Sequence, residues 1–444
     1  MRKYLYPILV GCTGILLVCI FLFSKSPEKP AAGLKPRTGS IALGGEWVET
    51  QKVIESLLTE IELNPENYTA KLNLSKGYIQ EARITGDHAY YDAAALELLD
   101  EVIANDPQNF DALCCKATVL LSQHHFSEAL RVAKTALPIN PNNAFIYGLM
   151  CDAYVELGQY KQAVKMADKM VNIRPDLRSY LRVSYLREIH GEIDGAIIAA
   201  KLAVDAGFPG LEETAWSRMI LAHLYEMKGH IDSAEFQYRT ALQERPGYAF
   251  ALAGLGKKEK VNGNYKKAIS YYRKAEKAIV EYSFSDELTD LYRLNGDTKN
   301  GYKSAYRVIK MLSPLSGDDE SVSGHGHYAD RELAYAYLKI NNADKALQHA
   351  LLEYNRRPKN IDVCETVAWV YYKQKKYRKA NQYISKALRT GSKNPTLLCR
   401  AGLIKFKAGK KQESKKLLGL AFKNDPVISD IKLKNEANYY RFKN

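Results

Sequence analysis

The sequence predicts an all-α protein: a right-handed α-solenoid of about ten helix-turn-helix units with an N-terminal transmembrane helix. The first observation is a period, because Pro107, Pro141, Pro175 and Pro209 follow one another at intervals of 34 residues. The second is that alanines recur twelve residues before most unit-ending positions, at Ala95, Ala129, Ala163, Ala234, Ala268, Ala346 and Ala380. A fixed period of this size means that each unit buries its apolar face only by stacking on its neighbours.

Residues 1–23 are predicted to form a transmembrane signal-anchor. Tyr4 to Phe23 is uncharged, and about twenty apolar residues in a helix span the hydrocarbon layer of a bilayer. The N-terminal tail before this run is only three residues long, which favours a cytoplasmic N-terminus. We therefore expect a single-pass, membrane-anchored protein whose repeats lie outside the cytoplasm, in the periplasm of a bacterial cell.

Two alternatives to an uncleaved anchor stay open. A cleaved signal peptide needs a small-x-small site, and the nearest candidate, Ser24-Lys25-Ser26, is followed directly by Pro27. A lipoprotein is the other alternative, because Leu9-Val10-Gly11-Cys12 resembles a bacterial lipobox. The apolar run continues beyond Cys12, which favours the anchor.

Residues 24–45 are rich in Pro, Gly, Ser and Lys and are predicted to be a flexible tether. The N-terminal part of the solenoid then covers residues 46–312 and opens with a helical half-unit at Trp47–Asn64.

The segment from Ala144 to Pro175 illustrates one unit. Apolar residues recur at helical spacing on both sides of Gly158. Glycine reaches the left-handed conformation that reverses the chain without a Cβ penalty. Pro175 ends the second helix because it lacks an N–H and clashes with the preceding turn.

Several units resemble the tetratricopeptide repeat. The segment ending at Pro246 has the matching residues in register: Leu221, Ala222, Tyr225, Gly229, Ala234, Tyr238 and Ala241. The resemblance covers residues 47 to 426, with departures at about eight extra residues around Ile84–Tyr91, at Gly301 and at Ser414. The chain is also similar to uncharacterised membrane-anchored or exported bacterial proteins of this family. That resemblance implies a protein-binding solenoid and names no substrate.

Residues 313–326 interrupt the repeats with Ser, Gly and Asp and are predicted to be a loop. His325 and His327, with acidic residues nearby, raise the alternative of a metal site, but a long loop offers little of the fixed geometry that a site needs. We predict no metal and no cofactor.

The basic C-terminal units, residues 327–426, and the capping helix and tail, residues 427–444, carry the charge of the chain. Of the net +14, residues 351–444 contribute +16, from 23 Lys and Arg against 7 Asp and Glu. Such an end could meet nucleic acid, an acidic protein, anionic lipid or polysaccharide. The plainer interpretation is a solvated, lysine-rich face.

No pattern in the sequence predicts catalysis. The chain has no Gly-rich phosphate loop after a strand, no nucleophile elbow and no HExxH run. Its five cysteines outside the anchor have neither disulfide nor metal-ligand spacing and are expected to be buried, small apolar residues: Cys114, Cys115, Cys151, Cys364 and Cys399. We predict that the protein is not an enzyme.

The resemblance places a partner-binding groove on the first helix of each unit. In this family, certain positions of the first helix face the groove. In the last three units these positions hold aromatic and cationic residues together, the composition favoured at binding hot spots. The predicted groove residues are Tyr328, Arg331, Tyr335, Trp369, Tyr372, Lys373, Phe406 and Lys407.

The predicted function is a protein–protein interaction scaffold or adaptor at the bacterial cell envelope. Its concave groove would hold an extended segment of one or more partner proteins, with the membrane as a second partner. The alternative is a module whose basic C-terminal units bind a polyanion, either a polysaccharide or a nucleic acid, although nucleic acid is not the expected partner.

Overall fold

The computed structural model describes residues 31–43, 45–313 and 327–443, which form helices and no strand. The expected anchor Tyr4–Phe23 and loop residues 314–326 lie outside this part of the chain. Within it, no helix has the length and apolar character needed to cross a membrane.

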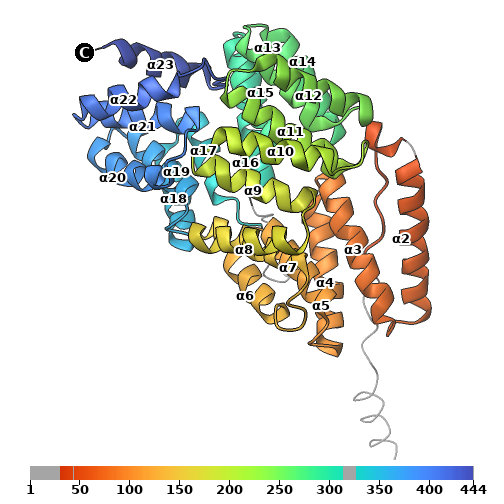
Figure 1. Cartoon of the computed structure of the whole chain (residues 1–444). Helices are drawn as coiled ribbons and strands as arrows, with labels where there is room; N and C mark the ends of the chain where they lie inside the picture. The colour runs from red at the N-terminus through yellow and green to blue at the C-terminus, as the bar shows by residue number, and fades with distance from the viewer. Residues whose placement is uncertain (1–30, 44, 314–326, 444) are drawn as a thin grey trace, which may run out of the picture.

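Figure 1 shows the helices packed side by side as consecutive pairs. A single helix, α2 (Gly45–Leu63), precedes them and α23 (Ile431–Phe442) follows them, as expected for a half-unit and a cap. Two short 3-10 helices are η2 (Gly39–Ala42) and η3 (Leu388–Thr390). The pairs are α3 (Tyr68–Thr85) with α4 (His88–Asn105), α5 (Phe110–Ser122) with α6 (Phe126–Ala136), α7 (Ala144–Glu156) with α8 (Tyr160–Ile173), α9 (Leu177–Ile189) with α10 (Ile193–Asp205), α11 (Glu212–Met227) with α12 (Ile231–Glu244), α13 (Ala249–Val261) with α14 (Tyr265–Ala278), α15 (Tyr282–Leu294) with α16 (Thr298–Leu312), α17 (Asp330–Lys339) with α18 (Ala343–Arg356), α19 (Ile361–Lys373) with α20 (Tyr377–Ala387), and α21 (Pro395–Lys407) with α22 (Lys411–Ala421).

The junctions between pairs combine a proline with a capping Asn or Asp. The Asn109 side chain accepts a hydrogen bond from the Ala112 N–H (3.0 Å), and that of Asn143 accepts one from the Phe145 N–H (2.8 Å). These bonds satisfy backbone donors that a helix start leaves free. The prolines therefore end one unit while the following Asn or Asp starts the next.

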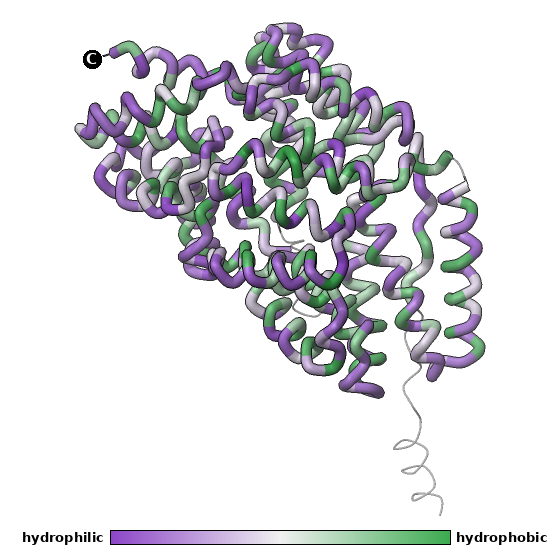
Figure 2. Tube along the Cα trace, in the orientation of Figure 1, coloured by the Kyte–Doolittle hydropathy of each residue, from purple (hydrophilic) through white to green (hydrophobic). Residues whose placement is uncertain are grey.

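The recurrent alanines lie between the helices, as the period predicts. All seven, Ala95, Ala129, Ala163, Ala234, Ala268, Ala346 and Ala380, are at most 2% exposed. Figure 2 shows hydrophobic and hydrophilic residues alternating along the helices, so that each helix has an apolar face to bury. The extra residues near Ile84 form no bulge, because α3 and α4 lengthen to 18 residues each.

Residues 31–43 are not the flexible tether expected from their composition. They pack along α3 and α4, where the Arg37 guanidinium is 6% exposed and donates to the fully buried carboxylate of Glu81 (Nε to Oε2, 3.0 Å). The Tyr90 hydroxyl donates to the Gly33 carbonyl (2.7 Å). The Gly and Pro content predicted flexibility, but a buried ion pair and backbone contacts hold this segment against the solenoid.

The solenoid coils so tightly that its second superhelical turn touches its first. Hydrogen bonds join residues 201 to 207 positions apart, about six 34-residue units along the chain. Figure 1 shows the result, with yellow α8 next to blue α18. We call this line of contacts the seam: it joins the turns within the first five pairs to the loops that precede α15, α17, α19, α21 and α23.

The seam is made largely of backbone contacts. The Val280 N–H donates to the Thr85 carbonyl (3.0 Å), and the Val427 N–H donates to the Glu226 carbonyl (2.9 Å). At its centre, the Ile361 N–H donates to the Tyr160 hydroxyl (3.0 Å). The two turns are thereby held at a fixed distance.

Candidate functional site

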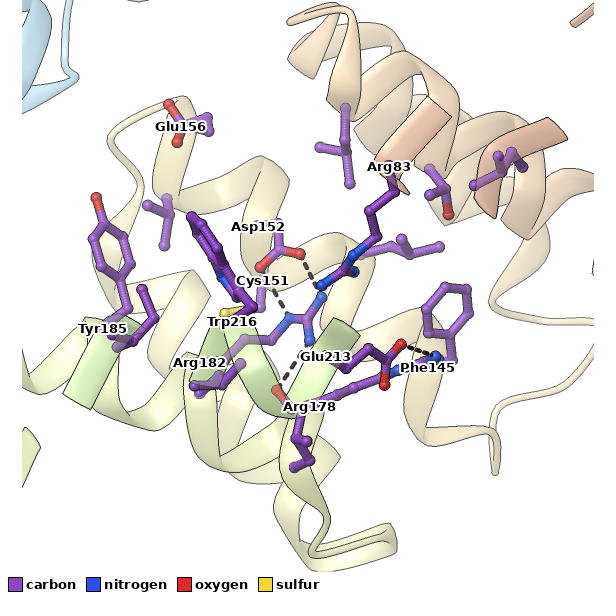
Figure 3. A pocket seen from close by; sticks show the side chains of 18 of the residues that line it. Arg83, Phe145, Cys151, Asp152, Glu156, Arg178, Arg182, Tyr185, Glu213 and Trp216 are labelled. Carbon is purple, nitrogen blue, oxygen red and sulfur yellow. Dashed lines mark hydrogen bonds and ion pairs between the residues drawn. The ribbon is translucent and has the colours of Figure 1, made fainter. Parts of the chain in front are cut away.

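A large pocket lies on the first helices of five consecutive pairs, α3, α5, α7, α9 and α11. We call it the inner pocket; its volume is about 780 Å³. Figure 3 shows the labelled side chains converging on it from these helices. The lining residues are Lys76, Ile79, Gln80, Arg83, Cys115, Thr118, Leu121, Phe145, Leu149, Cys151, Asp152, Val155, Glu156, Leu177, Arg178, Leu181, Arg182, Tyr185, Leu186, Glu213, Trp216 and Ile220.

Half of the residues that line the inner pocket have aromatic or aliphatic side chains. Trp216 is half-buried, and its ring lies edge-on to the ring of Phe250 at 5.2 Å between centroids. Phe145 and Tyr185 line the pocket from the neighbouring helices α7 and α9. A concave apolar surface with a few polar groups is the usual form of a binding pocket.

The charged groups of the inner pocket are all in ion pairs: two pairs lie within the lining, and Lys76, Arg83 and Glu156 pair with residues outside it. Arg182 donates twice to the carboxylate of Asp152 (2.9 and 2.5 Å), and Arg178 pairs with Glu213 (2.5 Å). Burial lowers the pKa of Arg182, but the charge of Asp152 and its hydrogen bond, together with smaller contributions from Cys151 and Asp176, raise it overall. Because these ion pairs neutralise each other, the inner pocket favours an apolar or aromatic group over a polyelectrolyte.

A smaller pocket of about 280 Å³ lies at the seam, and we call it the seam pocket. Leu121, Asp152 and Glu156 line both pockets, so the two adjoin. The second superhelical turn contributes the remaining charged groups. The full lining is Leu121, His124, Phe126, Asp152, Glu156, Arg331, Glu332, Arg357 and Asp362.

Three of the eight predicted groove residues lie on or next to α17. The Tyr328 N–H donates to the Gln123 carbonyl across the seam (3.1 Å). Arg331 lines the seam pocket. The Tyr335 hydroxyl accepts a hydrogen bond from the Arg400 guanidinium (2.8 Å).

Trp369 and Tyr372 are buried, at 4% and 6% exposure, with their rings stacked at 4.9 Å. The Tyr372 hydroxyl donates to Glu436 on α23 (2.6 Å). Lys373 is exposed, and its ammonium lies 4.4 Å from the Trp369 ring. These three residues therefore form one packed cluster that includes the capping helix.

The last two predicted groove residues also meet α23. The Phe406 ring lies 4.5 Å from that of Tyr440, and the Lys407 ammonium donates to the Tyr440 hydroxyl (2.7 Å). The capping helix thus occupies the side of the last units on which a partner was expected. The partner-binding role of the eight residues stays a prediction.

The sequence analysis missed the aromatic residues of the inner pocket, although the same offsets find them. The set of groove-facing positions that includes Trp369 in its own unit includes Phe145 when the unit is counted from Ala144, and Trp216 when it is counted from Glu212. The last three units are the ones predicted to bind a partner, because their aromatic residues accompany lysines and arginines. That composition marks a hot spot only where the side chains stay accessible.

The cysteines of the described residues are free, and all but Cys115 are buried, as expected for small apolar side chains. Burial raises the pKa of the Cys115 thiol to about 11 and that of Cys151 further. Both thiols line the inner pocket but are protonated at neutral pH, and the thiolate is the nucleophilic form. In the described part of the chain, no three His, Cys, Asp or Glu residues lie together as a metal site would need.

Basic side chains of the C-terminal units lie on the outer helices α20 and α22. Arg378, Lys379, Lys411, Lys415 and Lys416 are exposed. They lie apart from both pockets, so polyanion binding is a separate possibility and stays a prediction.

Comparison with known proteins supports the repeat assignment. Residues 120–183 match the tetratricopeptide repeat family. A sequence relative is the anaphase-promoting complex subunit CDC16 of Saccharomyces cerevisiae, 23% identical over 334 residues. The match covers 72% of this chain and 36% of that protein.

Two solved structures are similar to parts of this chain. A thermophilic tetratricopeptide-repeat protein of Thermus thermophilus is 26% identical, covers 40% of this chain and 92% of its own, and has a TM-score of 0.35. The human IFIT1 dimer with PPP-AAAA is 16% identical, covers 78% of this chain and 79% of its own, and has a TM-score of 0.47. The family match covers a segment in which α5 to α9 repeat the same helix pair that recurs through the described residues. The family match is therefore shown for residues 120–183, and the chain is similar to tetratricopeptide-repeat proteins.

Proposed function

We propose that this protein is a non-catalytic scaffold that captures an extended segment of a partner protein in the inner pocket. The observation that carries the proposal is the pocket itself: about 780 Å³ of largely apolar wall on five consecutive first helices. Its ion pairs are already satisfied internally. An apolar or aromatic side chain of the partner would supply the anchor, and the surrounding polar groups would orient its backbone.

The seam supports this proposal through rigidity. Contacts such as Val280 to Thr85 and Val427 to Glu226 join the two superhelical turns, so the pocket is formed before a partner arrives. A preformed pocket costs little ordering entropy on binding, and more of the contact energy therefore appears as affinity.

Replacing Trp216 by alanine should weaken partner capture about thirtyfold, since loss of a hot-spot aromatic typically costs ~2 kcal/mol of binding free energy. The matched control is Phe236→Ala, because Phe236 is 63% exposed on the outer helix α12. Partners would be isolated by proximity labelling and their affinities measured with each purified variant. Equal affinities of Trp216→Ala and wild type would reject the inner pocket as the binding site.

We also propose that the scaffold is tied to the bacterial cell envelope by Tyr4–Phe23, with the repeats outside the cytoplasm. The uncharged run of residues supports this proposal. The protein should fractionate with membranes and keep Met1 to Phe23, as N-terminal sequencing by mass spectrometry would report. A mature N-terminus beyond residue 24 would reject the anchor, and a lipidated Cys12 would replace it with a lipoprotein.

A further inference from the structure

The seam pocket carries more negative than positive charge. Four carboxylates line it, those of Asp152, Glu156, Glu332 and Asp362, against the two guanidinium groups of Arg331 and Arg357. Burial lowers the pKa of His124, so its ring is neutral at pH 7. The lining therefore has two more negative than positive formal charges, and Arg182, outside the lining, neutralises one of them by pairing with Asp152. Both superhelical turns contribute to this lining.

The arginines of the pocket leave its carboxylates incompletely paired, although the buried Nε of Arg331 also has no hydrogen-bond partner among the described residues. Arg357 is 5% exposed and is shared between Glu156 and Glu353. Arg331 contacts only one oxygen of Glu332, with Nη1 3.3 Å from Oε1.

Two carboxylates are left without donors. The Glu332 side chain is 10% exposed, and its Oε2 atom is buried and has no hydrogen-bond partner among the described residues. Within the same part of the chain, the Asp362 carboxylate forms no hydrogen bond or ion pair. A buried acceptor that lacks a donor costs ~1–3 kcal/mol, more if it is charged, so Glu332 Oε2 favours a bound donor, and the half-buried Asp362 carboxylate is available beside it.

The carboxylates around the seam pocket differ in the direction of their pKa shifts: burial raises the pKa of Glu332, but Arg331, His124 and Arg357 lower it overall, whereas the pKa values of two neighbours are raised. Burial raises the pKa of Glu156, Arg357 opposes that shift, and the nearby Asp362 charge adds to it. The pKa of Glu365 is likewise raised by burial and by the Asp362 charge. A bound cation would relieve this repulsion, whereas a bound anion would add to it.

We propose that the seam pocket is a binding site for an alkylammonium or guanidinium group, held by Glu332 and Asp362. The volume of about 280 Å³ accommodates the head and part of the aliphatic stem of a lysine or arginine side chain. Because the two pockets adjoin, one partner segment can place an apolar side chain against Trp216 and a basic side chain in the seam pocket. The idea that a partner protein supplies the cation rests on the proposed function. The site itself does not, because a free amine could fill it as well.

The test uses the full chain with butylammonium and butylguanidinium as probes, and 1-butanol as the uncharged probe of the same stem. Titration calorimetry should show one saturable site for each cation and none for 1-butanol. Asp362→Asn and Glu332→Gln should each weaken cation binding about tenfold or more, as loss of a charge-assisted contact does. Glu413→Gln, a change at an exposed carboxylate on α22, should leave the affinity unchanged.

A peptide with leucine beside lysine identifies the source of the cation. Its affinity should exceed that of butylammonium and fall in Trp216→Ala, while butylammonium binding in that variant stays unchanged. If the peptide binds no more tightly than butylammonium, the site serves a free amine and the inner-pocket proposal loses support. Cation affinities that are equal in wild type, Asp362→Asn and Glu332→Gln, with each variant folded by circular dichroism, would overturn the site.

Discussion

Replacing Gly158 by alanine is expected to destabilise the protein by about 3 kcal/mol and to loosen the contact between its superhelical turns. Gly158 has a φ of +70°, and a Cβ there would overlap the Lys359 carbonyl and lie 2.7 Å from the Asn360 nitrogen. These are backbone atoms at the centre of the seam and cannot rotate away. Chemical denaturation would measure the loss, and small-angle X-ray scattering would show a larger radius of gyration.

Gly263→Ala is the matched control for this experiment. Gly263 occupies the equivalent turn between α13 and α14 with a φ of +80°, but no atom lies within 4 Å of a Cβ placed there. Both variants pay the left-handed conformational cost of ~1–2 kcal/mol, and only Gly158→Ala adds the clash. Equal destabilisation with an unchanged radius of gyration would mean that the turns do not touch in solution.

Trp369→Ala is expected to destabilise the C-terminal pairs by about 3–5 kcal/mol, the usual cost of truncating a buried large aromatic residue. Trp369 is 4% exposed, stacks on Tyr372 and lies 5.2 Å from the Arg400 guanidinium. Because a solenoid transmits stability mainly between neighbouring units, the loss should concentrate in α17 to α23. Hydrogen exchange monitored by mass spectrometry would locate it.

Tyr306→Ala serves as the control, since Tyr306 is 58% exposed on α16; it should change the free energy of unfolding by less than about 0.5 kcal/mol. A Trp369→Ala variant that keeps its stability but loses partner capture would contradict the packed arrangement and favour an open groove at the last three units.

Local features of this chain could be predicted because they depend on residues close together in sequence. The alanines of the repeat are buried between paired helices because two helices approach closely only over small side chains. Asn and Asp at the junctions satisfy helix N-termini, and prolines end the preceding helices. The half-unit and the cap follow from the same helical periodicity.

The candidate site could be predicted only in part. The offset rule finds Phe145, Tyr185 and Trp216 in the inner pocket as readily as it finds Trp369. It says which side chains face the concave side of a unit, but it does not say which of them another element covers. At the C-terminal end, Glu436 and Tyr440 of α23 contact the predicted aromatic residues. Among the described residues, the inner pocket is lined by α3, α5, α7, α9 and α11, and α23 contributes nothing to it.

The sequence by itself determined the helix pairs, their order and their apolar faces, because a 34-residue period fixes each unit independently of the others. Only the tertiary structure decided how tightly the units coil, because superhelical pitch is the sum of small rotations at every junction. Together, these rotations bring Gly158 into contact with Lys359 and place Glu332 and Asp362 opposite Glu156. They also provide the surface on which residues 31–43 are ordered, with Ser40 next to Gly247. No local pattern encodes contacts between residues 200 positions apart, and these contacts form both the seam and its pocket.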